Sequence, residues 1–162
     1  MKSTTHCIEC GQPLSRGVHE FSQQLYGYSL CLKDQCRIAE SGATPQVVDL
    51  YLALKSRNFP VVLEYYDGFR HVDIALPGKL YIELNGDYED QRKMRVIADL
   101  THSVYALKKK IPTIIVSNIM LDNPENFAHI IEELSKACRV VLKPSYEFSV
   151  ACAPPFTAAQ LQ

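Results

Sequence analysis

The sequence lacks several features that would place it in a familiar class. No apolar run approaches the roughly 20 residues that a membrane-spanning helix needs, and the start MKSTTHCIEC lacks the apolar middle of a signal peptide. The chain has no internal repeat, no Gly-rich phosphate loop of the Walker or Rossmann type and no nucleophile elbow. We therefore expect a cytoplasmic protein with no membrane partner.

An excess of positive charge is also missing. The chain has 17 Lys and Arg residues against 18 Asp and Glu, so its formal net charge is −1. Proteins that bind nucleic acid usually carry a marked basic excess, so any such contact must use local patches. With 162 residues, of which 47% are hydrophobic and 22% charged, the sequence fits one globular core with a small appendage and excludes a largely disordered chain.

The appendage is expected at the amino terminus, where four of the six cysteines occur as Cys7-x2-Cys10 and Cys31-x4-Cys36. Structural disulfides are disfavoured in a reducing compartment, and two cysteine pairs about twenty residues apart are typical of a tetrahedral zinc site. Gly11 follows the first pair, as a tight knuckle requires. Four protein ligands leave no open position, so we expect this zinc to be structural.

The second cysteine pair is wider than the usual x2 spacing, which weakens the assignment of Cys36 most. His6 and His19 are alternative ligands. Redox-active or incidental cysteines are the competing interpretation of the same pattern.

The centre of the chain predicts a β-hairpin within residues 69–86, FRHVDIALPGKLYIELNG. Apolar residues alternate with period two on both sides of residues 77–79. Because a slip by one residue would turn one apolar set away from the core, the pattern also fixes the register. The predicted pairs are Leu76 with Leu80, Ile74 with Ile82, and Val72 with Leu84.

This register places Asp73 directly opposite Glu83 on the other face. Opposed side chains have Cβ atoms roughly 4.5 to 5.5 Å apart, so the two carboxylates repel each other unless a cation lies between them. Mg²⁺ takes oxygen ligands of this kind from one or two carboxylates. The alternative is that both acids lie on a solvated face where water and salt screen their charges.

The remaining pattern predicts helices and strands around this hairpin. Thr44 and Pro45 begin a helix that ends near Asn58, and Asn123 and Pro124 begin another. We expect further elements at residues 61–66 (strand), 90–110 (helix), 112–117 (strand) and 139–142 (edge strand). The expected organisation is a zinc module at 1–40, an α/β domain at 41–143 and an irregular tail at 144–162.

The order helix, three-stranded meander, helix, strand, helix, with Asp73 and Glu83 on the second and third strands, resembles the core of the PD-(D/E)XK nuclease superfamily. The likeness is greatest to short proteins related to the very-short-patch repair endonucleases, and it covers about residues 45–137. The matching segments are VDIAL at 72–76, KLYIELNG at 79–86, ADL at 98–100 and TIIV at 113–116.

The resemblance implies a restriction-endonuclease-like fold and a Mg²⁺- or Mn²⁺-dependent endonuclease acting on DNA. It implies that Asp73 and Glu83 bind the metal, with the main-chain carbonyl of Leu84 as a further ligand. Gln91 and Arg95 are candidates for orienting water or holding a phosphate.

The sequence departs from the superfamily at Asn85, which stands where a lysine is common. Phosphodiester hydrolysis benefits from a nearby cationic or acid/base group. Lys79, Lys93 or Arg95 would have to supply it.

Two functions therefore stay open. One is a metal-dependent nuclease, and the other is a zinc-stabilised module that keeps the fold but regulates or binds nucleic acid or protein without hydrolysis. A homodimer or another protein partner fits either function.

Overall fold

The protein is a mixed α/β structure in which a four-stranded sheet is combined with helices. The computed structural model describes residues 5–85 and 111–144. Two expected features, the helix at 90–110 and the irregular tail after residue 144, lie outside these residues. The described elements are α1 (Arg16–Tyr26), α2 (Leu32–Ala39), α3 (Pro45–Ser56), β1 (Val62–Tyr66), β2 (His71–Leu76), β3 (Leu80–Asn85), β4 (Thr113–Ser117), α5 (Asn118–Leu121) and α6 (Pro124–Leu142).

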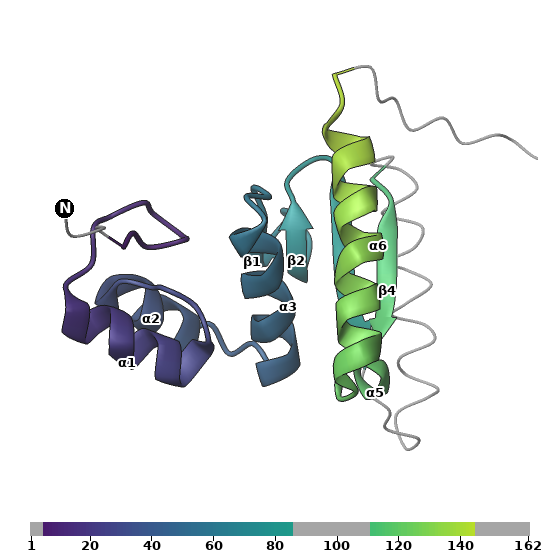
Figure 1. Cartoon of the computed structure of the whole chain (residues 1–162). Coiled ribbons are helices and arrows are strands. Elements are labelled where there is room, and N and C mark those ends of the chain that lie inside the picture. Colours follow the sequence, from purple (N-terminus) through teal and green to yellow (C-terminus); the bar gives the residue numbers. More distant parts are fainter. Residues whose placement is uncertain (1–4, 86–110, 145–162) are drawn as a thin grey trace, which may run out of the picture.

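The sheet has the strand order β1-β2-β3-β4 (Figure 1). The first three strands form the expected antiparallel meander, and β4 pairs with β3 in parallel. The hairpin register is confirmed at Leu76 with Leu80 and at Ile74 with Ile82. Gly78 has a φ of 73°, a left-handed conformation that glycine adopts without steric cost, as the tight connection requires.

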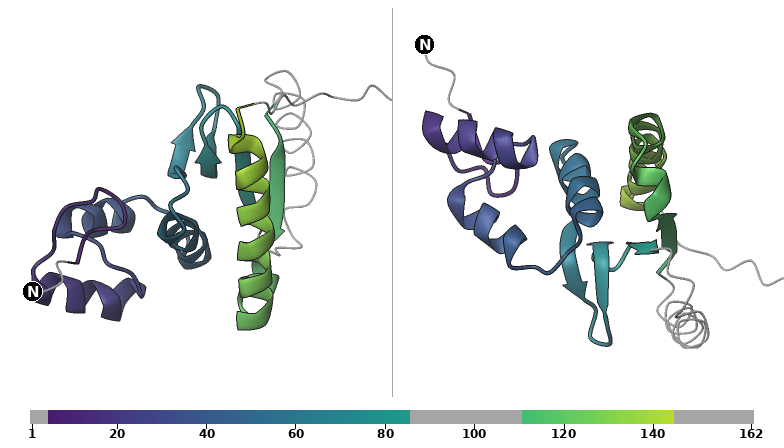
Figure 2. Two further views of the ribbon diagram at one scale, coloured as in Figure 1. Left: turned by 45° about the horizontal axis from the view of Figure 1, so that its top comes forward. Right: turned by 90° about the horizontal axis from the view of Figure 1, so that it is seen from below.

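The main core lies between the sheet and two helices that cover the same face of it, α3 and α6 (Figure 2). Leu50, Leu52 and Leu54 of α3 are fully buried, as are Ile74 and Ile82 of the sheet. On α6 the buried residues are Ile131, Leu134, Ser135, Cys138 and Val141. Burial of a large aliphatic side chain contributes roughly 1.5 to 3 kcal/mol, so this layer stabilises the sheet strongly.

Both predicted helix starts are confirmed by their caps. The side chain of Thr44 accepts a hydrogen bond from the Val47 amide, and that of Asn123 accepts from the amides of Glu125 and Asn126. The predicted edge strand at residues 139–142 is wrong, because α6 continues through Leu142. Val141 is buried as part of the apolar stripe that α6 presents to the core, and this burial favours continuation of the helix.

The pairing of β1 with β2 is irregular at Glu64. This residue has a φ of 48°, a left-handed conformation that is rare for a side chain other than glycine. Next to it, Val72 packs with Ala75 and Tyr81 in a second, smaller cluster, whereas Ile74 and Leu76 pack in the main core. The expectation that Val72, Ile74 and Leu76 form one apolar set is therefore wrong at Val72.

The amino-terminal segment folds around a tight turn and two helices, α1 and α2. The turn after Cys7 is closed by hydrogen bonds from the Cys7 amide to the Gln12 carbonyl, 2.8 Å, and from the Gly11 amide to the Cys7 carbonyl, 2.9 Å. Gly11 has a φ of 72°, so the expected knuckle is present and needs glycine there. Helix α1 was not expected from the sequence.

Arg57 joins α3 to α6. Its guanidinium donates to the Ser135 hydroxyl at 2.7 Å and to the Ile131 carbonyl at 3.2 Å, and it pairs with Glu132 at 3.3 Å.

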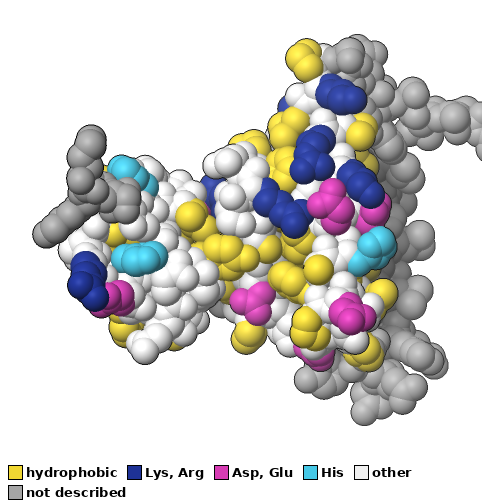
Figure 3. Space-filling model, viewed as in Figure 1, with side chains coloured by type: hydrophobic (Ala, Val, Ile, Leu, Met, Phe, Trp, Pro, Cys, Tyr) yellow, Lys and Arg dark blue, Asp and Glu magenta, His cyan; other side chains and the backbone are white. Residues whose placement is uncertain are grey.

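Figure 3 shows that basic side chains around α6 alternate with acidic ones on this face. None of the described helices combines the length and the apolar character of a membrane span.

Candidate functional site

Asp73 and Glu83 lie one step beyond the last hairpin pair, Ile74 with Ile82. Both side chains are partly buried. The Oδ2 atom of Asp73 accepts a hydrogen bond from the Leu84 amide at 2.7 Å, so the side chain of one strand reaches the backbone of the next. The two carboxylates are close enough for the charge of Asp73 to act on Glu83.

A cation within the chain already contacts this pair. The guanidinium of Arg70 forms an ion pair with the Glu83 carboxylate, and the two side chains are only 12% and 20% exposed. Arg70 ends the turn between β1 and β2, where the Asp67 side chain accepts hydrogen bonds from the amides of Phe69 and Arg70. The turn therefore fixes the backbone from which the guanidinium reaches Glu83.

The pKa of Glu83 stays above its ordinary value although the positive charge of Arg70 lowers it. Burial is the main cause that raises the pKa of Glu83 to about 7; Arg70 opposes this rise, and the Asp73 and Glu64 carboxylates add to it. Burial also raises the pKa of Asp73, although the hydrogen bond from the Leu84 amide and the charge of Arg70 act against this. Burial thus disfavours the ionised form of both carboxyls, and a bound cation would favour that form.

Glu64 is the third acid of what we call the carboxylate group, Glu64, Asp73 and Glu83. Burial raises its pKa, and the Asp73 carboxylate adds to the effect. The sequence had left open whether this residue approaches the acidic pair, and the structure brings it close enough to interact. Its φ of 48° is a form of backbone strain that costs on the order of 1 to 3 kcal/mol and often occurs at functional sites.

The other residues predicted for this site are placed only in part. Asn85 is the last residue of β3, paired with Ser117 of β4. Gln91, Arg95 and Lys93 lie outside the described residues. Lys79 is exposed in the hairpin connection.

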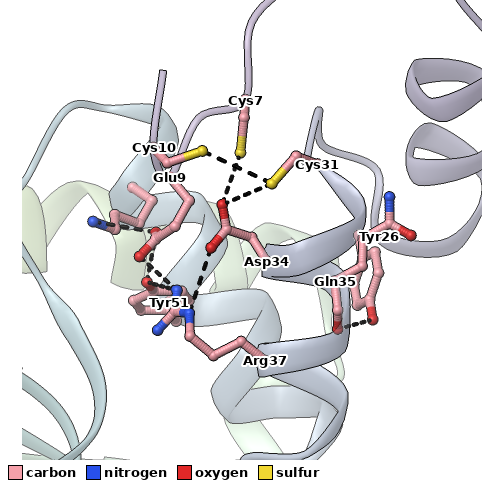
Figure 4. A network of polar contacts seen from close by, with 10 residues as sticks. Cys7, Glu9, Cys10, Tyr26, Cys31, Asp34, Gln35, Arg37 and Tyr51 are labelled. Atoms are coloured by element: carbon pink, nitrogen blue, oxygen red, sulfur yellow. Dashed lines mark hydrogen bonds and ion pairs between the residues drawn. The ribbon is translucent and has the colours of Figure 1, made fainter. Parts of the chain in front are cut away.

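A second group, formed by Cys7, Cys10, Cys31 and Asp34, could bind a metal such as zinc. One side-chain ligand atom from each residue lies within 4.8 Å of the others. Figure 4 shows the three sulfur atoms and the Asp34 carboxylate converging on one point. Within residues 5–85 and 111–144, no other set of three or more His, Cys, Asp and Glu ligand atoms lies this close. The ligand atoms of the carboxylate group are farther apart.

Three of the four predicted cysteines meet in this group, and Cys36 does not. Cys36 is exposed on α2, while Cys31 and Asp34 are buried. The predicted alternatives, His6 and His19, are also outside the group: His6 is exposed, and His19 hydrogen bonds to Ser29 at 3.0 Å. The structure therefore places an aspartate where the sequence pattern suggested a cysteine or a histidine.

The environment of Asp34 favours its ionised form. Burial alone would raise the pKa of this carboxyl, but hydrogen bonds from Cys31, Cys10 and Cys7 and the charge of Arg37 hold it below the usual value. The Cys7 and Cys31 thiols donate to Oδ2 at 3.2 and 3.1 Å. An ionised carboxylate next to three thiols is a suitable donor set for a divalent metal.

Two residues of these sites were missed from the sequence, Asp34 and Arg70. Asp34 follows Cys31 with the same x2 spacing that separates Cys7 from Cys10, so a search that admitted carboxylates as zinc ligands would have found it. Arg70 carries no comparable signal, because its role depends on how the turn folds back over β3.

Comparison of the chain with protein-family models, curated proteins and solved structures finds no match.

Proposed function

We propose that the protein is a divalent-metal-dependent nuclease that hydrolyses phosphodiester bonds in DNA, with a core of the PD-(D/E)XK type. The observation that carries this proposal is the pairing of Asp73 and Glu83 on neighbouring strands, half-buried and electrostatically coupled. The order of elements from α3 to α6 supports it, since the meander is followed by a parallel strand and a helix.

Mg²⁺ or Mn²⁺ suits the donor atoms of this group. Hard cations prefer carboxylate oxygens, and a bound ion would stabilise the ionised form of Glu83, whose pKa burial raises to about 7. Asp73 and Glu83 would hold the ion. When bound, it would polarise the phosphate and activate water.

Arg70 contributes the cationic group that Asn85 does not. It is close to Glu83 and largely buried, so a phosphate entering the group would meet a guanidinium held in place by the Asp67 turn. Arginine is well suited to this role because its planar guanidinium binds phosphate with two parallel hydrogen bonds. When substrate binds, Arg70 would leave Glu83 and pair with the phosphate instead.

The test is cleavage of plasmid and single-stranded DNA by purified protein with Mg²⁺ or Mn²⁺. Asp73→Asn keeps an oxygen that can accept from the Leu84 amide but removes the charge, so cleavage should fall by about two orders of magnitude or more while the fold is retained. Asp49→Asn is the matched control, because Asp49 is an acid on α3 outside the carboxylate group. Full activity in Asp73→Asn would overturn the proposal.

A second function, a metal-stabilised binding or regulatory module without hydrolysis, is favoured by one observation. The ion pair of Arg70 with Glu83 already supplies a cation from within the chain. This alternative predicts that calorimetry detects no Mg²⁺ or Mn²⁺ binding that depends on Asp73 and Glu83. Metal-dependent cleavage that is lost in Asp73→Asn would exclude it.

A further inference from the structure

We propose that Cys7, Cys10, Cys31 and Asp34 bind one zinc ion, with Oδ2 of Asp34 as the fourth ligand and Cys36 outside the site. This inference does not depend on nuclease activity, because it concerns a different part of the chain. The cysteine pattern alone would assign Cys36 as the fourth ligand in place of Asp34.

The sulfur–sulfur distance between Cys10 and Cys31 matches that of a tetrahedral zinc site, and the sulfur–oxygen distances are slightly shorter. With zinc–sulfur bonds of about 2.3 Å, two sulfurs at tetrahedral corners lie about 3.8 Å apart. The Sγ atoms of Cys10 and Cys31 are 3.8 Å apart. A sulfur and a carboxylate oxygen should lie about 3.5 Å apart by the same geometry, and Oδ2 of Asp34 is 3.2 Å from the sulfur of Cys7 and 3.1 Å from that of Cys31.

The start of α2 explains why Asp34 faces the sulfurs and Cys36 does not. Cys31 is the N-cap residue, and Asp34 follows three residues later, nearly one helical turn on and therefore on the same side. Cys36 follows five residues later, so it points about 140° away from Cys31 around the helix. This agrees with its exposure, in contrast to the burial of Asp34 and Cys31.

Neighbouring side chains hold the Asp34 carboxylate in the orientation that a ligand needs. While Oδ2 faces the sulfurs, Oδ1 lies 3.5 Å from Nε of Arg37. Arg37 in turn pairs with Glu9 at 2.5 Å, and the Tyr51 hydroxyl donates to Glu9 at 2.6 Å (Figure 4). Partners of this kind fix the orientation of metal-bound carboxylates.

The neighbouring charges offset part of the net negative charge of the complex, because Arg37 and Lys55 are positive and Glu9 is negative. Three thiolates and one carboxylate carry four negative charges against the two positive charges of zinc. Arg37 lies next to Asp34, and Lys55 pairs with Glu9 at 3.2 Å. Because Tyr51 and Lys55 belong to α3, the network also connects the cysteine knuckle to the helix that covers the sheet.

The test is zinc analysis and X-ray absorption spectroscopy of the full chain loaded with zinc. We expect one zinc per chain with three sulfurs at about 2.3 Å and one oxygen or nitrogen at about 2.0 to 2.2 Å. Cys36→Ser should give the same spectrum and the same zinc content. Asp34→Cys should change the fit from three sulfurs to four.

Four sulfurs in the natural chain, falling to three in Cys36→Ser, would overturn the proposal, as would a chain that binds no zinc. If Asp34→Cys does not fold, the comparison of the natural chain with Cys36→Ser still decides the ligand set. Neither result bears on cleavage, so failure here is distinct from failure of the proposed nuclease.

Discussion

Arg70, in the turn between β1 and β2, forms an ion pair with Glu83 of β3. The two side chains are only 12% and 20% exposed. The guanidinium lowers the pKa of Glu83 against the larger effect of burial. Arg70→Gln should therefore raise the pKa of Glu83 above its value of about 7. Carbon NMR titration of the glutamate carboxyl carbons measures this, with Arg57→Gln as a control that removes an arginine elsewhere. An unchanged titration of Glu83 in Arg70→Gln would refute the coupling.

The stability of the metal-free protein should decrease as the pH rises from about 4.5 to 7. Glu83 releases its proton near its ordinary value of 4.5 in the unfolded chain but near 7 in the folded chain. The folded state binds more protons in this interval, so the free energy of unfolding falls with increasing pH. Glu83→Gln cannot titrate and should remove on the order of 2 kcal/mol of this decrease.

Urea denaturation at pH 5 and pH 7.5, with chelator present, measures that difference. Asp73 and Glu64 also have raised pKa values, so a smaller slope of the same sign should remain in Glu83→Gln. Equal slopes in the natural chain and the variant would contradict the prediction.

Replacement of Glu64 by glycine should stabilise the protein. The φ of 48° is strained for glutamate but accessible to glycine, and the substitution also removes a carboxylate that interacts with Asp73. We expect a gain of about 1 kcal/mol in the free energy of unfolding. Glu64→Gln is the control, since it removes the charge and keeps the strain. A loss of stability in Glu64→Gly relative to Glu64→Gln would contradict the prediction.

The contact between α3 and α6 should depend on Arg57. Its guanidinium bonds to the buried Ser135 hydroxyl and to the Ile131 carbonyl, and hydrogen bonds to charged groups contribute about 1.5 to 3 kcal/mol. Arg57→Ala should lower the free energy of unfolding by about that amount. Lys136→Ala removes an exposed ion pair with Glu133 that water and salt screen, so it should have a clearly smaller effect. Equal effects of the two substitutions in thermal or urea denaturation would contradict this account.

Much of the fold could be predicted because local signals and burial agree. Thr44 and Asn123 cap their helices as expected, and the alternation around residues 77–79 fixes the pairing of Ile74 with Ile82. The prediction failed at Val72, which packs with Ala75 and Tyr81 in the smaller cluster, whereas period-two alternation would place it with Ile74. It failed again at residues 139–142, where β-branched residues on the helix were interpreted as a strand.

The candidate sites were harder to predict because both depend on side chains brought together by turns. A count of cysteines leads to Cys36, whereas the start of α2 turns Asp34 toward the sulfurs. The acidic pair could be found from alternation alone. Arg70 could not, because only the folded turn brings its guanidinium to Glu83.

The most direct test of the proposed nuclease is a crystal structure grown with Mn²⁺ and examined by anomalous diffraction. The proposal predicts an anomalous peak within bonding distance of carboxylate oxygens of both Asp73 and Glu83, absent from crystals of Asp73→Asn. Crystals of the natural chain with no peak there, and with Arg70 still paired to Glu83 at saturating Mn²⁺, would contradict it.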